Sequence, residues 1–134
     1  MDKIIMARQR ITVDRDQAME TMTGVGLEGG SAYYTDDGSI NVLGELVAME
    51  NTPISSYIEV HVVVYSADGD ILGRNYTNWS KFGLRQSFKL EIENEDSSLN
   101  PTRVKIYPSF GWRDKFCKLE WACGFQKILQ SSLT

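Results

Sequence analysis

The sequence has few of the residues that metal sites and nucleophilic sites most often use. It contains one histidine, His61, and two cysteines, Cys117 and Cys123, among 134 residues. A single histidine excludes a multi-histidine metal site and leaves one histidine as a candidate general base. Two cysteines are too few for the disulfide framework of a small secreted domain, although a bridge between them stays open. We therefore predict no enzyme, no catalytic residues, no cofactor and no metal.

Long apolar runs are also absent. Near the start of the chain, only the short apolar run 4–6 precedes Arg8 and Arg10. A secretory signal needs an apolar core of about 7–15 residues, and a membrane span needs about 20. The sequence therefore predicts a soluble cytoplasmic protein without membrane contact, and a signal segment removed beforehand stays open.

An excess of positive charge is lacking too. Fourteen basic and eighteen acidic residues give a net charge of −4. A general nucleic-acid binder needs a basic face that displaces counterions from phosphates, so we expect no nucleic-acid partner. The 42% of hydrophobic residues and 24% of charged residues are typical of a folded domain.

From residue 39 onward, the sequence predicts strands. Five strand-like runs are separated by short turns, with no long helical pattern between them; they cover 40–49, 57–65, 70–76, 86–92 and 102–108. This pattern is typical of an antiparallel all-β fold.

The run at 57–65 is the clearest of the five. Because side chains alternate along a strand, one of its faces is wholly apolar and is predicted to lie in the core; it comprises Ile58, Val60, Val62 and Val64. The opposite face carries His61, Val63 and Tyr65 and is predicted to be partly covered. Residues 66–69 then predict a type I turn with glycine at its fourth position, which makes 57–76 a hairpin.

Residues 1–31 are predicted to form a partly flexible N-terminal arm, and residues 32–134 a single domain. A short helix over 14–22, capped by Thr12 or Asp14, fits part of the arm. The glycines of 24–29 match the text of a dinucleotide fingerprint, but that site needs a strand before the glycines and a helix after them. We interpret this glycine-rich stretch as a flexible connection.

A family resemblance rests on the central hairpin and its neighbours. Residues 62–66 read Val-Val-Val-Tyr-Ser and are followed by Asp-Gly at 68–69 and by Ile-Leu-Gly at 71–73; Gly-Glu-Leu at 44–46 precedes them, and Phe-Gly at 82–83 and Gln-Ser-Phe at 86–88 follow. Over 39–107 this pattern resembles the FxLYD family of small Ig-like domains, with Tyr65 at the tyrosine of the signature. The resemblance implies an antiparallel Ig-like β-sandwich with a binding or structural role and without a common catalytic site.

Residues 108–134 add a C-terminal aromatic extension. The segment 114–129 fits both a helical face and a strand, and both stay open. We predict Trp112, Trp121 and Phe125 as partner-binding anchors, because such side chains are favoured at interfaces, with Tyr76 and Trp79 as a second surface.

The function expected from these observations is a non-enzymatic interaction or structural module. It would recognise a protein partner, or a second copy of itself, through a sheet edge or the aromatic extension. The alternative is a domain that binds a small ligand or calcium at the acidic turns, through Asp36, Asp37, Asp68 and Asp70. Aspartates in turns also commonly bond their own backbone, which needs no ligand.

Overall fold

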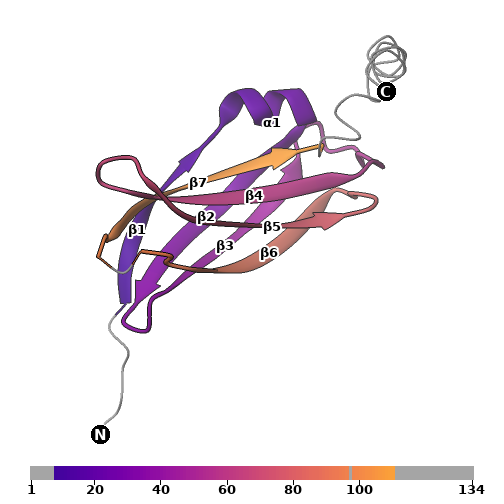
Figure 1. Ribbon diagram of the computed structural model, residues 1–134. Helices are drawn as coiled ribbons and strands as arrows, with labels where there is room; N and C mark the ends of the chain where they lie inside the picture. The colour runs from indigo at the N-terminus through magenta and orange to yellow at the C-terminus, as the bar shows by residue number, and fades with distance from the viewer. Residues whose placement is uncertain (1–7, 97, 111–134) are drawn as a thin grey trace, which may run out of the picture.

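The computed structural model describes residues 8–96 and 98–110, which form seven strands and one short helix (Figure 1). In chain order the elements are β1 (Arg8–Arg15), α1 (Gln17–Thr23), β2 (Val25–Thr35), β3 (Ser39–Ala48), β4 (Ile58–Ser66), β5 (Ile71–Trp79), β6 (Arg85–Glu93) and β7 (Pro101–Ser109). The prediction of an all-β fold is confirmed, and all five predicted strands are present as β3 to β7.

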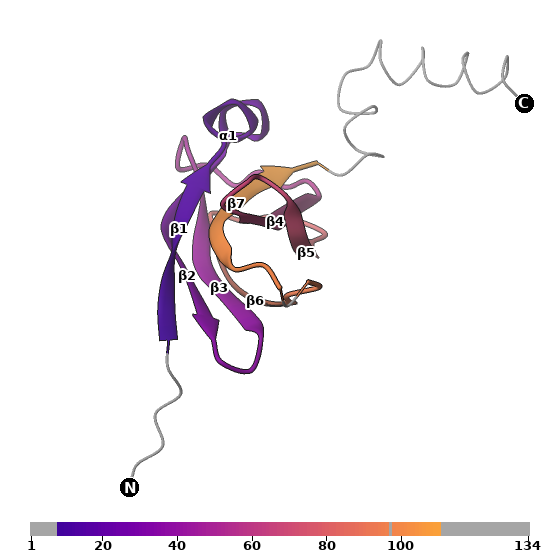
Figure 2. The ribbon, with the colours of Figure 1, turned by 60° about the vertical axis from the view of Figure 1, so that its left-hand side comes forward.

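The strands form one curled sheet in the order β5-β4-β7-β1-β2-β3-β6. Figure 2 shows the curl, with β1, β2 and β3 on one side of the interior and β7, β4 and β5 on the other. The two end strands meet at a seam, where the Glu95 backbone N–H donates to the Leu72 carbonyl at 3.0 Å and Asn75 Nδ2 donates to the Glu91 carbonyl at 3.0 Å. The sheet is therefore nearly closed.

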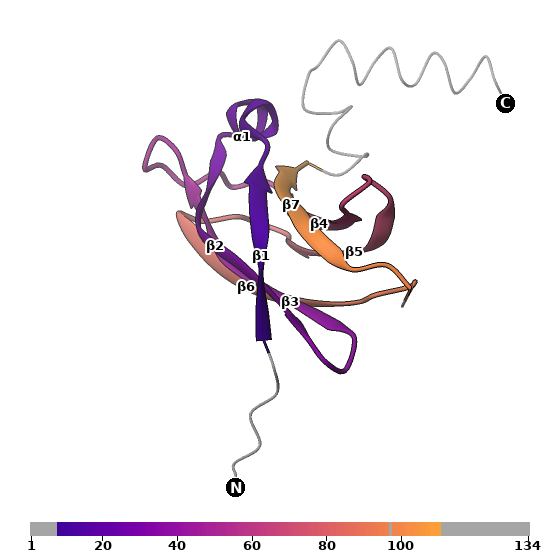
Figure 3. The same ribbon diagram turned by 90° about the vertical axis from the view of Figure 1, so that its left-hand side faces the viewer.

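Strand β1 connects the two sides of the sheet. Its residues 8–11 pair antiparallel with β2, and its residues 12–15 pair in parallel with β7. Figure 3 shows β1 between these two neighbours. The prediction of a purely antiparallel sheet is therefore wrong at this one pair, since the other pairs of neighbouring strands are antiparallel.

The expected N-terminal arm also differs from the structure. Residues 8–31 form β1, α1 and the first part of β2, so they belong to the sheet and its end cover. The stretch interpreted as a flexible connection begins at the end of α1 and continues into β2, where the pairing with β3 shifts register between Glu28 and Ser31. Gly29 has a φ of +64° at this irregularity, a conformation that glycine adopts easily.

Helix α1 begins later than predicted. Asp16 caps it by accepting the Met19 backbone N–H at 3.1 Å, and Gly24 ends it in the left-handed conformation. Residues 12–15 cannot belong to the helix because their backbone pairs with β7. Arg15 and the buried Glu20 form a two-point ion pair, which fastens the helix to the end of β1.

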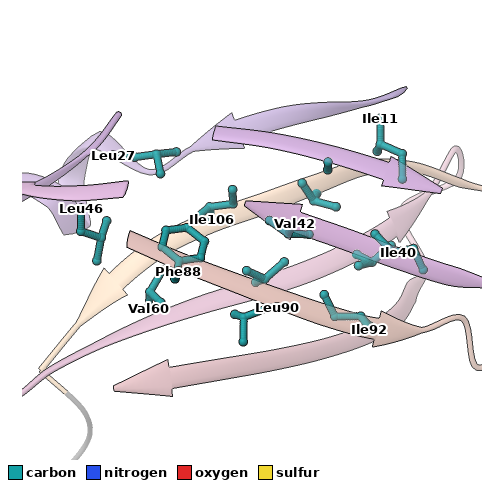
Figure 4. Close-up of a cluster of buried hydrophobic side chains, with 14 of the residues drawn as sticks. Ile11, Leu27, Ile40, Val42, Leu46, Val60, Phe88, Leu90, Ile92 and Ile106 are labelled. Carbon is teal, nitrogen blue, oxygen red and sulfur yellow. The ribbon is translucent and has the colours of Figure 1, made fainter. Parts of the chain in front are cut away.

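The core fills the interior between the two sides of the sheet (Figure 4). The predicted inner face of β4 is confirmed, because Ile58, Val60, Val62 and Val64 are all 0% exposed. In β4 and β6, buried apolar side chains occupy alternate positions, as the alternation of strand residues requires, whereas β5 contributes mainly Leu72 and Trp79. The buried side chains labelled in Figure 4 are Ile11, Leu27, Ile40, Val42, Leu46, Val60, Phe88, Leu90, Ile92 and Ile106.

The predicted hairpin joins β4 to β5. The Gly69 backbone N–H donates to the Ser66 carbonyl at 3.0 Å, and Gly69 has a φ of +90°. The turn places Ser66 opposite Asp70, and a register shift between Val64 and Tyr65 then places Arg74 opposite Val63 and Tyr76 opposite His61. Among the described residues, no helix has the length and apolar character needed to cross a membrane.

Candidate recognition face

The structure describes two of the five predicted binding residues, Tyr76 and Trp79, and it does not bring them together. Both lie in β5, three positions apart, so their side chains point to opposite faces of the sheet. Trp79 packs against the core and meets the buried Phe82 edge to face, with ring centroids 5.7 Å apart. Tyr76 is 52% exposed on the outer face. Trp112, Trp121 and Phe125 lie outside the described residues.

The outer face of β5, β4 and β7 carries a row of three parallel rings. His61 stacks on Tyr76 at 5.3 Å between centroids and on Tyr107 at 5.2 Å, with interplanar angles of 14° and 10°. The sheet produces this row because His61 is the cross-strand partner of both tyrosines. The rings therefore stand side by side across three adjacent strands.

The central ring is held in place by its own strand. Nε2 of His61 lies 2.6 Å from Oε1 of Glu59, and the Tyr57 hydroxyl donates to the other carboxylate oxygen of Glu59. Because the imidazole is fixed by one carboxylate and by two flanking rings, its orientation is set before any partner arrives. A rigid aromatic surface loses little side-chain entropy on binding.

A second row lies beside the rings and combines an apolar centre with two cations. Val63 of β4 is the cross-strand partner of Arg74 of β5 and of Lys105 of β7. Val63 is only 5% exposed although it points to the outer face. A third row follows, in which the Arg103 guanidinium lies 5.4 Å from the centre of the Tyr65 ring, within cation–π distance.

We call these three rows the aromatic-basic face; its residues are His61, Val63, Tyr65, Arg74, Tyr76, Arg103, Lys105 and Tyr107. Part of it is hollowed into a groove of about 610 Å³, whose lining includes His61, Val63 and Arg74. Strand alternation could have predicted this face, because Arg103, Lys105 and Tyr107 occupy alternate positions of one predicted strand. The register of three separate strands could not be obtained from the sequence.

Carboxylates border the aromatic-basic face on the side of β1. Asp14 accepts from Arg103 at 3.0 Å, and Asp16 lies 3.4 Å from Nζ of Lys105. The Met19 backbone N–H and, to a smaller extent, Lys105 lower the pKa of Asp16. Asp16 therefore stays ionised at neutral pH, where it both caps α1 and holds Lys105.

The opposite outer face, over β2, β3 and β6, has a different character. Arg85 of β6 bonds Glu45 of β3 and Glu28 of β2, and these two carboxylates raise its pKa. Tyr33 of β2 is covered by Arg10, whose guanidinium lies 5.2 Å from the ring centre. These contacts occupy Arg85 and Arg10, whereas Lys89, Glu91 and Glu93 of β6 are exposed on the same face.

In the turn between β2 and β3, the carboxylate of Asp37 bonds within its own turn. Asp37 accepts from the Thr35 hydroxyl and, at 3.0 Å, from the Ser39 backbone N–H, and these contacts lower its pKa. In the other turn, the Asp70 backbone N–H donates to the Ser66 hydroxyl at 3.2 Å. Within 8–96 and 98–110, no group of three or more His, Cys, Asp or Glu side chains is placed to hold a metal ion.

Comparisons with known proteins assign no family to this chain. No family model matches it, and no curated protein matches it. Among solved structures, a putative beta-galactosidase from Bacteroides fragilis is similar over 64% of this chain and 16% of its own, with a TM-score of 0.32 and 10% sequence identity. The chain thus spans less than a fifth of that protein, and a similarity this low supports no conclusion about fold or function.

Proposed function

We propose that this chain is a non-enzymatic recognition module that binds a protein partner, or a second copy of itself, through the aromatic-basic face. In this proposal the nearly closed sheet is an Ig-like β-sandwich of the FxLYD type, and its location is cytoplasmic. The observation that carries the proposal is the fixed row Tyr76–His61–Tyr107 beside the apolar Val63.

Tyrosine and arginine support this choice of surface. Both are enriched among the residues that contribute most to binding at protein interfaces, and the face contains three tyrosines and two arginines. On the opposite face, Arg85 is held by Glu28 and Glu45 and Tyr33 is covered by Arg10, so these side chains have less to offer a partner.

The outer face of the sheet fits the structure better as a binding surface than an open sheet edge. The edge strands β5 and β6 already meet at the seam, and the Tyr76 backbone N–H donates to its neighbour's side chain at Asn75 Oδ1, 2.8 Å away. A partner strand added there would have to displace these bonds. The anchors predicted in the aromatic extension, Trp112, Trp121 and Phe125, stay a prediction; the extension follows β7, the strand that contributes Tyr107 to the face.

The test compares Tyr76→Ser with the matched control Leu43→Ser. Both side chains are exposed on strands, at 52% and 37%, but Leu43 lies on the opposite face. The first measurement is the molar mass of the full chain by light scattering. If the chain is a dimer, we expect Tyr76→Ser to weaken the dimer by tenfold or more and Leu43→Ser to leave it unchanged.

If the full chain is a monomer, the same two variants serve as baits for partners in an extract of the source cells. We expect wild type and Leu43→Ser to retain a partner that Tyr76→Ser does not retain. Both variants should keep the wild-type melting temperature within a few degrees. Equal retention by all three baits would contradict the proposal. Retention that is lost only on truncation after Phe110 would move the binding surface to the extension.

A further inference from the structure

The charges of the aromatic-basic face are arranged unevenly. Arg103 and Lys105 each have a carboxylate partner on the β1 side, whereas Arg74, on β5, pairs with no carboxylate among the residues that the structure describes. Arg74 is exposed and lines the same groove as Lys105. The centre of the face therefore presents one unneutralised guanidinium.

The surroundings of Arg74 would strengthen its attraction for an anion. Its cross-strand neighbour Val63 is nearly buried, so the floor between Arg74 and Lys105 is apolar. An anionic group that settles over Val63 is shielded from water, and a charge-assisted hydrogen bond is stronger in such a place than on an open surface. The rings of His61 and Tyr107 line the same groove and offer apolar contact beside the cation.

We propose that the occupant of the aromatic-basic face is an acidic peptide segment, with one carboxylate bound to Arg74 over Val63 and a neighbouring apolar side chain against the rings. This inference rests on the proposed function, and it names the chemistry of the partner. In this arrangement Arg74 determines specificity, because it is the one cation of the face whose charge is not already balanced by a neighbouring carboxylate.

The borders of the face favour a peptide over a nucleic acid. A nucleic-acid strand needs a continuous track of cations for successive phosphates. Here Asp14 and Asp16 border the face on the β1 side, and Asp16 and Glu59 line the same groove as Arg74, so the cations form no continuous track. The whole chain also carries a net charge of −4, which repels a long polyanion. A single carboxylate needs only one cation, and the net charge repels it less than it repels a long polyanion.

The test uses nuclear magnetic resonance of the full chain with three probes. The first is a blocked peptide in which glutamate alternates with valine, the second is the same peptide with glutamine in place of glutamate, and the third is a short thymidine oligonucleotide. We expect the glutamate peptide to shift backbone amide signals of β4, β5 and β7, to bind at least tenfold more tightly than the glutamine peptide, and to weaken as salt is added.

Two variants locate the interaction. Arg74→Gln should weaken binding of the glutamate peptide by about tenfold, as expected for loss of one charge-assisted hydrogen bond. Arg85→Gln removes the same charge from the opposite face and should leave the affinity unchanged. Because Arg74 forms no ion pair with the residues that the structure describes, Arg74→Gln should leave the fold and the melting temperature unchanged.

Each other outcome overturns the inference in a distinct way. Equal binding of both peptides at this face would remove the preference for acid and leave the recognition function standing. If the oligonucleotide binds more tightly than the glutamate peptide and its binding also depends on Arg74, the occupant is a phosphate chain and not an acidic peptide. If the glutamate peptide shifts no amide signals of β4, β5 or β7, the proposal of an acidic peptide as occupant is refuted. The proposed recognition function is decided separately by the comparison of Tyr76→Ser with Leu43→Ser.

Discussion

Closure of the sheet depends on the absence of a side chain at Gly73. A Cβ atom placed there would lie 2.6 Å from Cγ2 of Ile92 and 2.9 Å from the backbone oxygen of Glu93. Carbon atoms in contact are normally about 3.5–4.0 Å apart, so Gly73→Ala requires β5 and β6 to separate by close to 1 Å. Ile92 is 4% exposed and one of the two clashing atoms is backbone, so a side-chain rotation cannot relieve the contact.

We expect Gly73→Ala to lower the free energy of unfolding by about 1–3 kcal/mol, the usual cost of overpacking a core. With a urea m-value of about 2 kcal/mol/M, the midpoint of unfolding should fall by roughly 0.5–1.5 M. Gly83→Ala is the matched control. No atom lies within 4 Å of its added Cβ and its φ is not in the left-handed region, so its midpoint should barely change.

A double-mutant cycle identifies the clashing partner. In an Ile92→Ala background, the Cγ2 contact is gone and only the Glu93 oxygen remains close, so Gly73→Ala should cost clearly less than in wild type. The assay is urea unfolding followed by tryptophan fluorescence and circular dichroism. A Gly73→Ala midpoint equal to that of Gly83→Ala would refute the close seam between β5 and β6.

Two further predictions concern the ion pair of α1 and the β2–β3 turn. Glu20→Gln should lower the free energy of unfolding by about 1–3 kcal/mol in urea, because the Glu20 side chain is only 3% exposed; equal loss in Glu45→Gln, whose side chain is 29% exposed, would contradict this. Since the pKa of Asp37 is lowered by folding, its stabilising contribution is present above about pH 4 and is lost as the pH falls through the folded pKa. Between pH 5 and pH 2, the melting temperature of Asp37→Asn should therefore fall less than that of wild type. If the melting temperatures of the two proteins fall in parallel with pH, the hydrogen bonds of the turn do not stabilise the fold.

The strands predicted from the sequence are those with an uninterrupted alternation of apolar and polar residues. The inner face of β4 could be predicted because alternation alone places Val60, Val62 and Val64 on one side. Strand β2 was missed because its glycines indicate a flexible segment when they are considered alone. In the structure, Gly30 lies where an added Cβ would be 3.1 Å from Leu27 and 3.4 Å from Ile106. Close packing, visible only in three dimensions, therefore accounts for that glycine.

The candidate face shows the same limit. The sequence predicts Tyr76 and Trp79 as one surface because they are close in the chain, but a spacing of three places them on opposite sides of a strand. The neighbours that Tyr76 actually has, His61 and Tyr107, come from two other strands. Their alignment depends on the β4–β5 and β4–β7 registers, which the sequence of any single strand does not contain.

The divided pairing of β1 has a consequence for how the protein folds. The parallel pair joins residues 12–15 of β1 to residues 103–106 of β7. The second half of β1 therefore stays unpaired until β7 has been synthesised. During synthesis, β2 and β3, and later β4 and β5, can form hairpins as they emerge, but β1 and β7 can pair only when nearly all of the described chain has left the ribosome. Until then the second half of β1 and the edge of β4 that β7 later covers are open to other chains, which makes the interval before completion the time of greatest aggregation risk.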